Sequence, residues 1–289
     1  MNYHELTLRL RSLYERGEAE AIARLVMEER FGLSLTHLAL GKDKDFSLKE
    51  RTDLENIAQK LCAGVPVQQV LGYATFMGRR FSVTDQVLIP RPETSELVQW
   101  VVDEMPAFPP AEGDDPVVIA DFGTGSGCIA VSLALADRRP ARVLGVDVSE
   151  TALQVAQENA RRLGAAVEFS RLDIRQTEVV CTALPRLSCI ISNPPYVRQS
   201  ERAGMAPHVV AHEPALALFV PDADPLLFYR AIARIGRQSL HPGGLVFVEL
   251  NSALAGPTAR LFEDENYSDI CIRQDQFGKE RMLRAAYHG

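Results

Sequence analysis

The sequence lacks any long apolar run. A membrane-spanning helix needs about 18 or more consecutive apolar residues, and none of the hydrophobic segments approaches that length. The opening segment, MNYHELTLRLRSLYERGEAE, carries charges throughout, whereas a secretion signal has an uninterrupted apolar core. We therefore expect a soluble, cytoplasmic protein with no membrane partner.

Cysteine is sparse, with five widely spaced residues and no Cys-x-x-Cys pair. The odd number and the spacing indicate neither a disulfide framework nor a zinc site. His208 and His212 are four residues apart, but they lack the glutamate of a zinc-protease arrangement and a nearby cysteine. We predict that the cysteines are buried free thiols and that the protein binds no metal. We expect the two histidines to belong to a mobile loop over the ligand site.

The sequence also lacks an excess of positive charge. The chain has 31 Lys and Arg against 38 Asp and Glu, a net charge of −7. Proteins that hold nucleic acid through its phosphates need clustered positive charge, so we expect no direct nucleic-acid binding. The first 75 residues follow the same trend, with 10 basic against 11 acidic side chains. Recognition of a protein fits this segment better.

The chain is long enough, at 289 residues with 46% hydrophobic content, for one large and one small domain. We expect a helical bundle over residues 1–73 and a β-hairpin linker over 74–90, around Gly78-Arg79-Arg80. Ser47 and Glu50 have the spacing of a capping box that opens the last helix of the bundle. Two sets of residues have the spacing of one helix face each: Tyr3, Leu6, Leu10 and Leu13, and Leu54, Ile57, Ala58 and Leu61.

Residues 91–289 alternate between helical and strand patterns. Such alternation predicts an α/β fold in which helices cover both faces of a mostly parallel sheet. An exposed loop is expected over 106–116, and Trp100 should pack in the core with Leu97 and Val101. The predicted helices cover residues 94–105, 128–136, 150–163, 225–239 and 253–264, and the strands cover 117–121, 142–147, 167–170, 189–192 and 245–250, before two final strands.

A glycine-rich turn follows the first of these strands. Glycine occupies every second position from Gly123 to Gly127, with Thr124 and Ser126 between, so backbone can approach a ligand closely. Cys128 stands where the dinucleotide fingerprint requires its last glycine, so a nicotinamide cofactor is not indicated. Asp121 ends the strand, where it would repel a diphosphate but could hold the ammonium group of a methionine moiety.

Two further acids follow the next strands. Asp147 lies twenty residues beyond Gly127, at the edge of the sheet where a carboxylate accepts from both ribose hydroxyls. Asp173 could accept from an adenine amino group, and Ile174 could pack on the ring. The glycines alone would equally suit a tight strand-to-helix turn, and Asp173 alone a surface acid. Together with Asp147, the pattern predicts an adenosyl ligand.

Asn193-Pro194-Pro195-Tyr196 leaves the carboxyl end of a short apolar strand. The prolines stiffen the turn and remove backbone donors. The Asn193 side-chain oxygen and the Pro194 carbonyl then remain as acceptors for both N–H bonds of a planar amide or aromatic amine. Such a nitrogen is a poor nucleophile, so positioning would carry the reaction. Tyr196 would form a flat wall, and the motif predicts transfer of a methyl group from S-adenosylmethionine to nitrogen.

The sequence resembles the glutamine N5-methyltransferases of the HemK/PrmC type, which modify the glutamine of the Gly-Gly-Gln loop in peptide chain release factors. The resemblance implies a helical substrate-recognition domain, a hairpin, and a Rossmann-like methyltransferase domain that uses S-adenosylmethionine and yields S-adenosylhomocysteine. It also implies that Asn193 and Pro194 hold the glutamine. The matching blocks are Pro66 to Gly72, Val87 to Thr94, Asp121 to Gly127, Asn193 to Tyr196, His212 to Leu218, and Gly278 to Arg281.

Some features leave alternatives open. Phe122 stands where the family more often has a smaller aliphatic residue, and Ile174 where some relatives have an aromatic one. Arg91, Glu93 and Glu213 would either shape the pocket or form surface ion pairs. A glutamine methyltransferase acting on a ribosomal protein, an N6-adenine or N4-cytosine DNA methyltransferase, and an adenosyl-binding module without turnover are the competing functions.

Overall fold

The computed structural model describes residues 1–109, 116–137 and 141–289. Within these residues the chain forms two compact units. The smaller unit combines Met1–Ala74 with Met205–Glu213, and the larger combines Thr75–Gly204 with Pro214–Gly289. The inclusion of residues 205–213 in the smaller unit was not expected from sequence. The exposed loop predicted over 106–116 is wrong in part, because Met105–Ala107 form the 3₁₀ turn η2 and Phe108 is buried in a core. Residues 110–115 lie outside the described residues.

The smaller unit is helical. Leu54, Ile57, Ala58 and Leu61 are buried as predicted. Leu13 was predicted on the buried face of the first helix, but that helix ends at Leu10, and the turn beyond it leaves Leu13 53% exposed. The helices are α1 (Tyr3–Leu10), α2 (Arg16–Phe31), α3 (Leu35–Ala39), the 3₁₀ turn η1 (Lys42–Asp45), α4 (Leu48–Cys62), α5 (Val67–Leu71) and α10 (Pro207–His212).

The capping box at the start of α4 is confirmed. The Ser47 hydroxyl accepts from the backbone N–H of Glu50, and the Glu50 carboxylate accepts from the backbone N–H of Ser47 at 2.8 Å. These reciprocal bonds satisfy backbone donors that a helix start leaves unpaired. The local sequence therefore sets where this helix begins.

The mobile loop predicted around His208 and His212 is wrong, because both residues belong to the short helix α10. Gln69 donates to the backbone carbonyl of His212 at 2.8 Å, and the His212 ring lies 3.3 Å from the carbonyl of Ala63. These contacts hold α10 against the helices of its own unit. Sequence could not reveal them because the partners are more than 140 residues apart.

The predicted hairpin is confirmed. Strand β1 (Tyr73–Phe76) pairs with β2 (Arg79–Ser82) in a two-stranded sheet, and Gly78 takes a positive φ of 74° in the turn.

The larger unit is built on a seven-stranded sheet, which confirms the predicted α/β class. Its strand order is β10-β11-β9-β6-β3-β4-β5. The last five strands run parallel, and β11 pairs antiparallel with both of its neighbours, β9 and β10. A separate two-stranded sheet joins β7 (Val197–Arg198) and β8 (Phe219–Val220). The main strands are β3 (Val117–Phe122), β4 (Ala141–Asp147), β5 (Val167–Arg171), β6 (Leu187–Ser192), β9 (Leu240–Glu249), β10 (Tyr267–Gln274) and β11 (Glu280–Tyr287).

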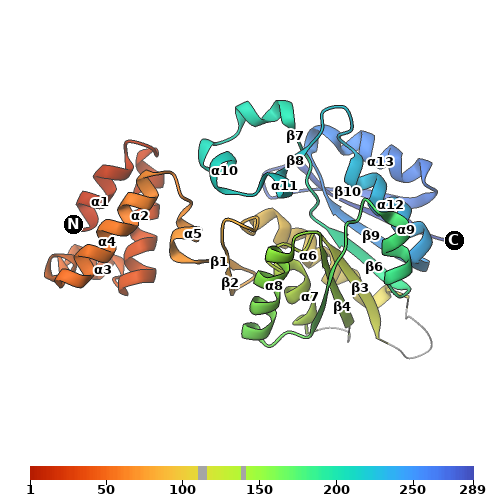
Figure 1. Cartoon of the computed structure of the whole chain (residues 1–289), viewed down its shortest axis with the longest axis horizontal. Coiled ribbons are helices and arrows are strands. Elements are labelled where there is room, and N and C mark those ends of the chain that lie inside the picture. Colours follow the sequence, from red (N-terminus) through yellow and green to blue (C-terminus); the bar gives the residue numbers. More distant parts are fainter. Residues whose placement is uncertain (110–115, 138–140) are drawn as a thin grey trace. The chain divides into compact units, whose positions relative to one another are not determined.

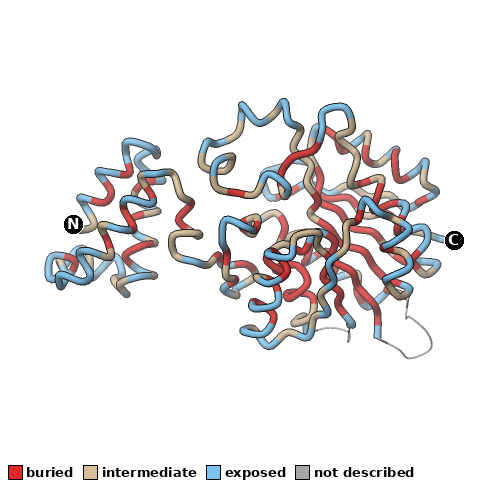
Figure 2. Tube along the Cα trace, viewed as in Figure 1, coloured by how far each residue is buried: buried red, intermediate tan, exposed pale blue. Residues whose placement is uncertain are grey.

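Helices cover both faces of this sheet (Figure 1). On one face lie α6 (Pro92–Glu104), α7 (Cys128–Ala134) and α8 (Glu150–Leu163), and on the other α9 (Thr177–Ala183), α12 (Leu227–Ser239) and α13 (Ala255–Asp264). Successive strand residues alternate between the two cores: Ile119 belongs to the core that contains Trp100, and Ala120 belongs to the core that contains Ile232. Figure 2 shows the buried residues concentrated along the strands. Besides β7, β8 and α10, the short elements that sequence missed include α9, α11 (Ala215–Leu218), η3 (Gln199–Gly204) and η4 (Ser252–Leu254).

The predicted core position of Trp100 is confirmed, since its side chain is 2% exposed and meets Phe247 edge to face at 5.4 Å. The prediction of buried thiols holds only for Cys128 and Cys189, because Cys62, Cys181 and Cys271 are half-buried. Among the described residues, none of the helices is both long and apolar enough to cross a membrane. Within ranges 1–109, 116–137 and 141–289, no cluster of His, Cys, Asp or Glu could hold a metal.

Candidate active site

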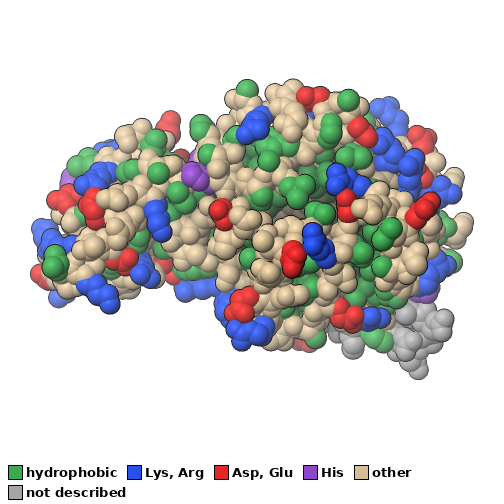
Figure 3. Space-filling view, viewed as in Figure 1, with side chains coloured by type: hydrophobic (Ala, Val, Ile, Leu, Met, Phe, Trp, Pro, Cys, Tyr) green, Lys and Arg blue, Asp and Glu red, His purple; other side chains and the backbone are tan. Residues whose placement is uncertain are grey.

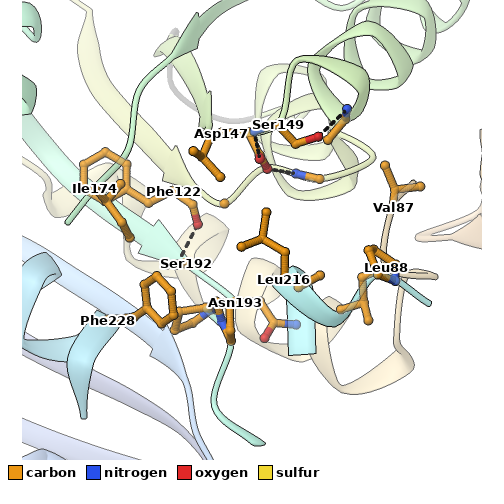
Figure 4. Close-up of a pocket in the computed structure, with 18 of the residues that line it drawn as sticks. Val87, Leu88, Phe122, Asp147, Ser149, Ile174, Ser192, Asn193, Leu216 and Phe228 are labelled. Atoms are coloured by element: carbon orange, nitrogen blue, oxygen red, sulfur yellow. Dashed lines mark hydrogen bonds between the residues drawn. The ribbon is translucent and has the colours of Figure 1, made fainter. Parts of the chain in front are cut away.

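A cavity of about 350 Å³ opens at the carboxyl edge of the sheet in the larger unit (Figure 4). The strand order reverses between β3 and β6 at this edge, which is where ligands bind in open α/β sheets. Among the residues predicted for the site, the cavity is lined by Gly123, Gly125, Asp147, Asp173, Ile174, Asn193, Pro194 and Pro195. The other predicted residues lie outside its lining: Asp121, Thr124, Ser126, Gly127 and Tyr196.

The glycine turn bends sharply between β3 and α7. Gly123, Gly125 and Gly127 have φ values of 74°, 54° and 78°, a region that favours glycine. A Cβ on Gly127 would lie 3.0 Å from the Cβ of Ala156 on α8. Gly127 therefore permits close packing of two helices, while Gly123 and Gly125 present backbone to the cavity.

Asp121 lies beneath this turn. Its Oδ2 accepts from the Thr124 hydroxyl at 2.6 Å and from the backbone N–H of Ala130 at 3.1 Å. Its Oδ1 is buried and has no hydrogen-bond partner among the described residues. Burial raises the pKa of Asp121 to about 7. In this structure the side chain supports the loop from below, whereas sequence placed it directly against a ligand.

Asp147 ties the end of β4 to the glycine turn. Its Oδ2 accepts from the backbone N–H of Gly125 and its Oδ1 from that of Ser149, both at 2.9 Å. Burial raises the pKa of Asp147, and these backbone donors oppose the shift. Figure 4 shows this carboxylate beside Ser149 at one end of the cavity.

The loop after β5 supplies another part of the wall. Ile174 is buried and faces the cavity together with Phe122 (Figure 4). Asp173 forms a two-pronged ion pair with Arg175, with a shortest distance of 2.7 Å. The Arg175 guanidinium lowers the pKa of Asp173. Asp173 therefore carries a charge partner that the sequence interpretation did not include.

Asn193 follows β6 and belongs to a buried hydrogen-bond network. Its Nδ2 donates to the Thr94 hydroxyl at 3.1 Å, and that hydroxyl donates to Glu249 Oε2 at 2.6 Å. The Tyr196 hydroxyl donates to the other Glu249 oxygen at 2.9 Å. Tyr196 is thus held by Glu249 outside the cavity lining, and its contact with a planar substrate group stays a prediction.

Burial also shifts the titration of this network. It raises the pKa of Glu249, and the hydrogen bonds from Thr94 and Tyr196 and the charge of Arg281 oppose that shift. The pKa of Tyr196 is raised well above its ordinary value, first by burial and then by the Glu249 charge.

Several cavity residues were not predicted as site residues. Leu88 and Val87 lie in a block that matched the family without an assigned role, and Ser149 follows Asp147 by two positions. Phe228 had no sequence signal, because only the fold brings α12 to this edge. Arg91, Glu93 and Glu213 lie outside the cavity lining; Glu213 is buried and the other two are half-buried. The unpredicted lining residues include Gln86, Val87, Leu88, Val148, Ser149, Ala152, Leu172, Pro214, Ala215, Leu216, Ala217 and Phe228.

Known relatives match almost the whole chain. It is 41% identical over 278 residues to the release factor glutamine methyltransferase of Bacteroides thetaiotaomicron, covering 96% of this chain and 95% of that protein. It is 35% identical to the release factor glutamine methyltransferase of Flavobacterium psychrophilum, with the same coverage of 96% and 95%. The chain belongs to the release factor glutamine methyltransferase family.

Two domain models match this family member in succession. The PrmC N-terminal domain matches residues 3–72, and the Methyltransferase small domain matches residues 108–218. The second match contains the glycine turn, Asp147 and Asn193, so the predicted ligand and transfer residues lie in a methyltransferase domain.

Solved structures with low sequence identity share the fold of this family member. The hMettl16 catalytic domain, solved with a MAT2A 3'UTR hairpin, has a TM-score of 0.55 at 13% identity, covering 93% of this chain and 81% of that chain. A methyltransferase from Pyrococcus furiosus has a TM-score of 0.50 at 17% identity, covering 84% and 100%. At these identities the likeness shows the fold alone.

Proposed function

We propose that the protein transfers a methyl group from S-adenosylmethionine to the side-chain nitrogen N5 of the glutamine in the Gly-Gly-Gln motif of peptide chain release factors. The observation that carries this proposal is that the predicted substrate-binding residues and the predicted cofactor-binding residues line one cavity. Asn193 and Pro194 line the same space as the glycine turn and Asp147. A nitrogen held by the first pair would therefore meet a ligand held by the second.

The residues around the cavity suit S-adenosylmethionine. When bound, it supplies an electrophilic sulfonium methyl group and leaves as S-adenosylhomocysteine. The Asp147 carboxylate would accept from the ribose hydroxyls, and Ile174 would pack on the adenine ring. Gly123 and Gly125 would let backbone approach the methionine portion. Asp121, buried beneath the turn with an oxygen that lacks a described partner, would add negative charge below its ammonium group.

Asn193 and Pro194 would orient the accepting amide. An amide nitrogen is a weak nucleophile because its lone pair is delocalised. Two acceptors that hold both of its N–H bonds would aim the nitrogen at the methyl group, and this positioning would supply much of the rate. The nitrogen becomes strongly acidic as the new N–C bond forms, so its proton can pass to water without a dedicated strong base.

The domain assignment follows the same proposal. We assign residues 1–73 to substrate recognition, 74–90 to a hairpin linker and 91–289 to the methyltransferase domain. On the face drawn in Figure 3, Lys and Arg side chains are interspersed with Asp and Glu. This surface and the net charge of −7 favour a protein substrate over DNA.

Incubation with radiolabelled S-adenosylmethionine tests the proposal. Release factor, a ribosomal protein mixture and duplex DNA should be offered separately, with a release factor whose motif glutamine is replaced by alanine as control. We expect label in the intact release factor only. Label confined to ribosomal proteins or DNA would overturn the substrate assignment, and label in the alanine variant would overturn the assigned position.

A further inference from the structure

Thr94 and Glu249 form a buried chain of hydrogen bonds behind Asn193. Thr94 lies in the first turn of α6 and is 2% exposed, and Glu249 ends β9 and is 1% exposed. Neither residue lines the cavity. The chain runs from the Asn193 amide nitrogen to the Thr94 hydroxyl and on to Glu249 Oε2, over 3.1 and 2.6 Å. These bonds thus link side chains from three segments that are distant in sequence.

The chain has a defined direction. A hydroxyl has one proton to donate, and an ionised carboxylate can only accept. Thr94 therefore donates its proton to Glu249, and its oxygen can only accept a hydrogen bond from Asn193. The NH₂ group is the only part of the Asn193 amide that can donate that bond. This places the Asn193 nitrogen toward Thr94 and turns its oxygen away, so the oxygen is the acceptor that remains for the cavity.

Burial raises the pKa of Glu249, and several neighbouring groups oppose that shift by stabilising the carboxylate. Its second oxygen accepts from the Tyr196 hydroxyl at 2.9 Å, and the positive charge of Arg281 acts on it from β11. Arg281 is itself held by Asp275 at 3.3 Å and by the carbonyl of Leu250 at 3.1 Å. Glu93 contributes an opposing negative charge. Two donors and one nearby cation thus stabilise a charge that burial alone would disfavour.

We propose that Glu249 and Thr94 are positioning residues that keep the oxygen of the Asn193 amide toward the cavity and so select an acceptor nitrogen that carries hydrogens. The reversed amide would present its own NH₂ to the substrate NH₂ and repel it. This inference rests on the proposed function for its kinetic test, but the orientation of Asn193 can be measured without any substrate.

The kinetic test compares two variants at Thr94. Thr94→Val keeps the shape but removes the hydroxyl, and Thr94→Ser keeps the hydroxyl. We expect Thr94→Val to lower the single-turnover methylation rate of the release factor by roughly 10-fold to 100-fold, as small misplacements of reacting groups do. The dissociation constant for S-adenosylmethionine should change less than about 3-fold, because Thr94 lies outside the cavity. Thr94→Ser should restore most of the rate.

Thr258→Val is the matched control for loss of a buried threonine hydroxyl. Thr258 is fully buried on α13 and donates to the backbone carbonyl of Leu254 at 2.8 Å, away from the cavity. We expect this variant to lose thermal stability with little change in rate. An equal loss of rate in Thr94→Val and Thr258→Val would mean that general destabilisation is the cause, and would overturn the proposal.

Glu249→Gln tests the direction of the chain. Glutamine offers one acceptor and one donor group where the carboxylate offers acceptors to both Thr94 and Tyr196. At least one of these partners must then reverse or lose its bond. We expect a rate loss similar to that of Thr94→Val with cofactor affinity retained. A wild-type rate in Glu249→Gln would show that the carboxylate is not needed for positioning.

A substrate-free measurement separates this inference from the proposed function. Protein labelled with ¹⁵N-asparagine should show the side-chain NH₂ of Asn193, assigned through Asn193→Ala. We expect Thr94→Val to shift this signal and Thr94→Ser to leave it near its wild-type position. If no release factor is methylated but the signal shifts as expected, the proposed function fails and the positioning role stands. An unshifted signal in Thr94→Val overturns the positioning role.

Discussion

Asn193 combines an amide nitrogen that is already bonded to Thr94 with an oxygen left for a ligand. Replacing it with alanine removes one of the two acceptors that we propose for the substrate nitrogen, and leaves the cofactor side of the cavity intact. We predict that Asn193→Ala lowers kcat by about 100-fold, comparable to the loss of one well-placed hydrogen bond to a reacting group. The dissociation constant for S-adenosylmethionine, measured by calorimetry, should rise much less.

Asp147→Ala is the matched control at the other end of the cavity. It should act chiefly on cofactor affinity, because its carboxylate holds Gly125 and is the group that we propose to bind the ribose hydroxyls. An Asn193→Ala enzyme that loses affinity and rate equally would contradict the assigned role of the asparagine.

Asp121 leads to a prediction about stability and pH. Its folded pKa of about 7 lies above its ordinary value of 3.8. The folded state therefore binds a proton that the unfolded state releases between about pH 4 and pH 7, and stability falls as pH rises through that window. The loss amounts to at most about 4 kcal/mol. We predict that Asp121→Asn flattens this dependence and is more stable than the wild type at pH 8.

Urea unfolding of both proteins at a series of pH values measures the effect. The difference between the two curves isolates Asp121 from all other titrating groups. Parallel curves between pH 4 and pH 7 would show that Asp121 titrates in the folded protein as it does in the unfolded one.

Cavity residues could be predicted from the sequence where a polar side chain stands at the carboxyl end of an apolar strand. Asp147 ends one apolar strand and Asn193 follows another, and parallel strands bring such ends together. Glu249 carried a comparable signal, an acid ending the apolar run Leu245 to Val248, but nothing local identified its partners. Thr94 lies 155 positions away from it, and only the folded sheet and α6 bring the two together.

At the scale of elements, the contact between α7 and α8 depends on Gly127. An alanine there would need an unfavourable positive φ and would also press its Cβ against Ala156, 3.0 Å away. We predict that Gly127→Ala destabilises the protein by about 2 to 4 kcal/mol, the sum of a left-handed residue and an overpacked contact. It should also weaken cofactor binding, because the glycine turn must shift.

Gly164→Ala provides the comparison. Gly164 ends α8 with a φ of 72°, and a methyl group added there would meet no atom within 4 Å among the described residues. The substitution should cost only the backbone strain, about 1 to 2 kcal/mol, and leave cofactor binding unchanged. Equal unfolding free energies for Gly127→Ala and Gly164→Ala would show that the close approach to Ala156 does not contribute to the loss of stability.

Long elements with a clear hydrophobic period were predicted well, and short ones were missed. Helix α8 has the predicted bounds of 150–163, because an apolar face and the glycine at 164 define it fully. Helix α11 has four residues and α10 has six. Segments of one turn carry too few residues for a period to show, and tertiary contacts such as that of Gln69 with His212 determine them.

At the scale of the whole molecule, each unit has its own hydrophobic core. The buried core of the smaller unit is formed by residues from Leu6 to Val67, and the two buried cores of the larger unit begin at Phe76 and at Val118. A substitution in the core of one unit can therefore destabilise that unit without changing a core residue of the other. This separation gives a direct test of the proposed division of labour between recognition and catalysis.

Leu54 is fully buried on α4 in the core of the smaller unit. Leu54→Ala should destabilise that unit by about 2 to 5 kcal/mol through lost burial and a cavity. Calorimetry should show a lower-temperature transition while the transition of the larger unit stays in place. We predict that affinity for S-adenosylmethionine is retained and that kcat/KM for the release factor falls at temperatures where the smaller unit has unfolded.

Ile232→Ala on α12 is the opposite control, because Ile232 is fully buried in a core of the larger unit. It should lower the transition of that unit and weaken cofactor binding at elevated temperature. If Leu54→Ala instead removed cofactor binding together with substrate methylation, the smaller unit would be required to hold the methyltransferase unit in its folded state. If Leu54→Ala left kcat/KM unchanged after its own unit had melted, residues 1–73 would not recognise the substrate.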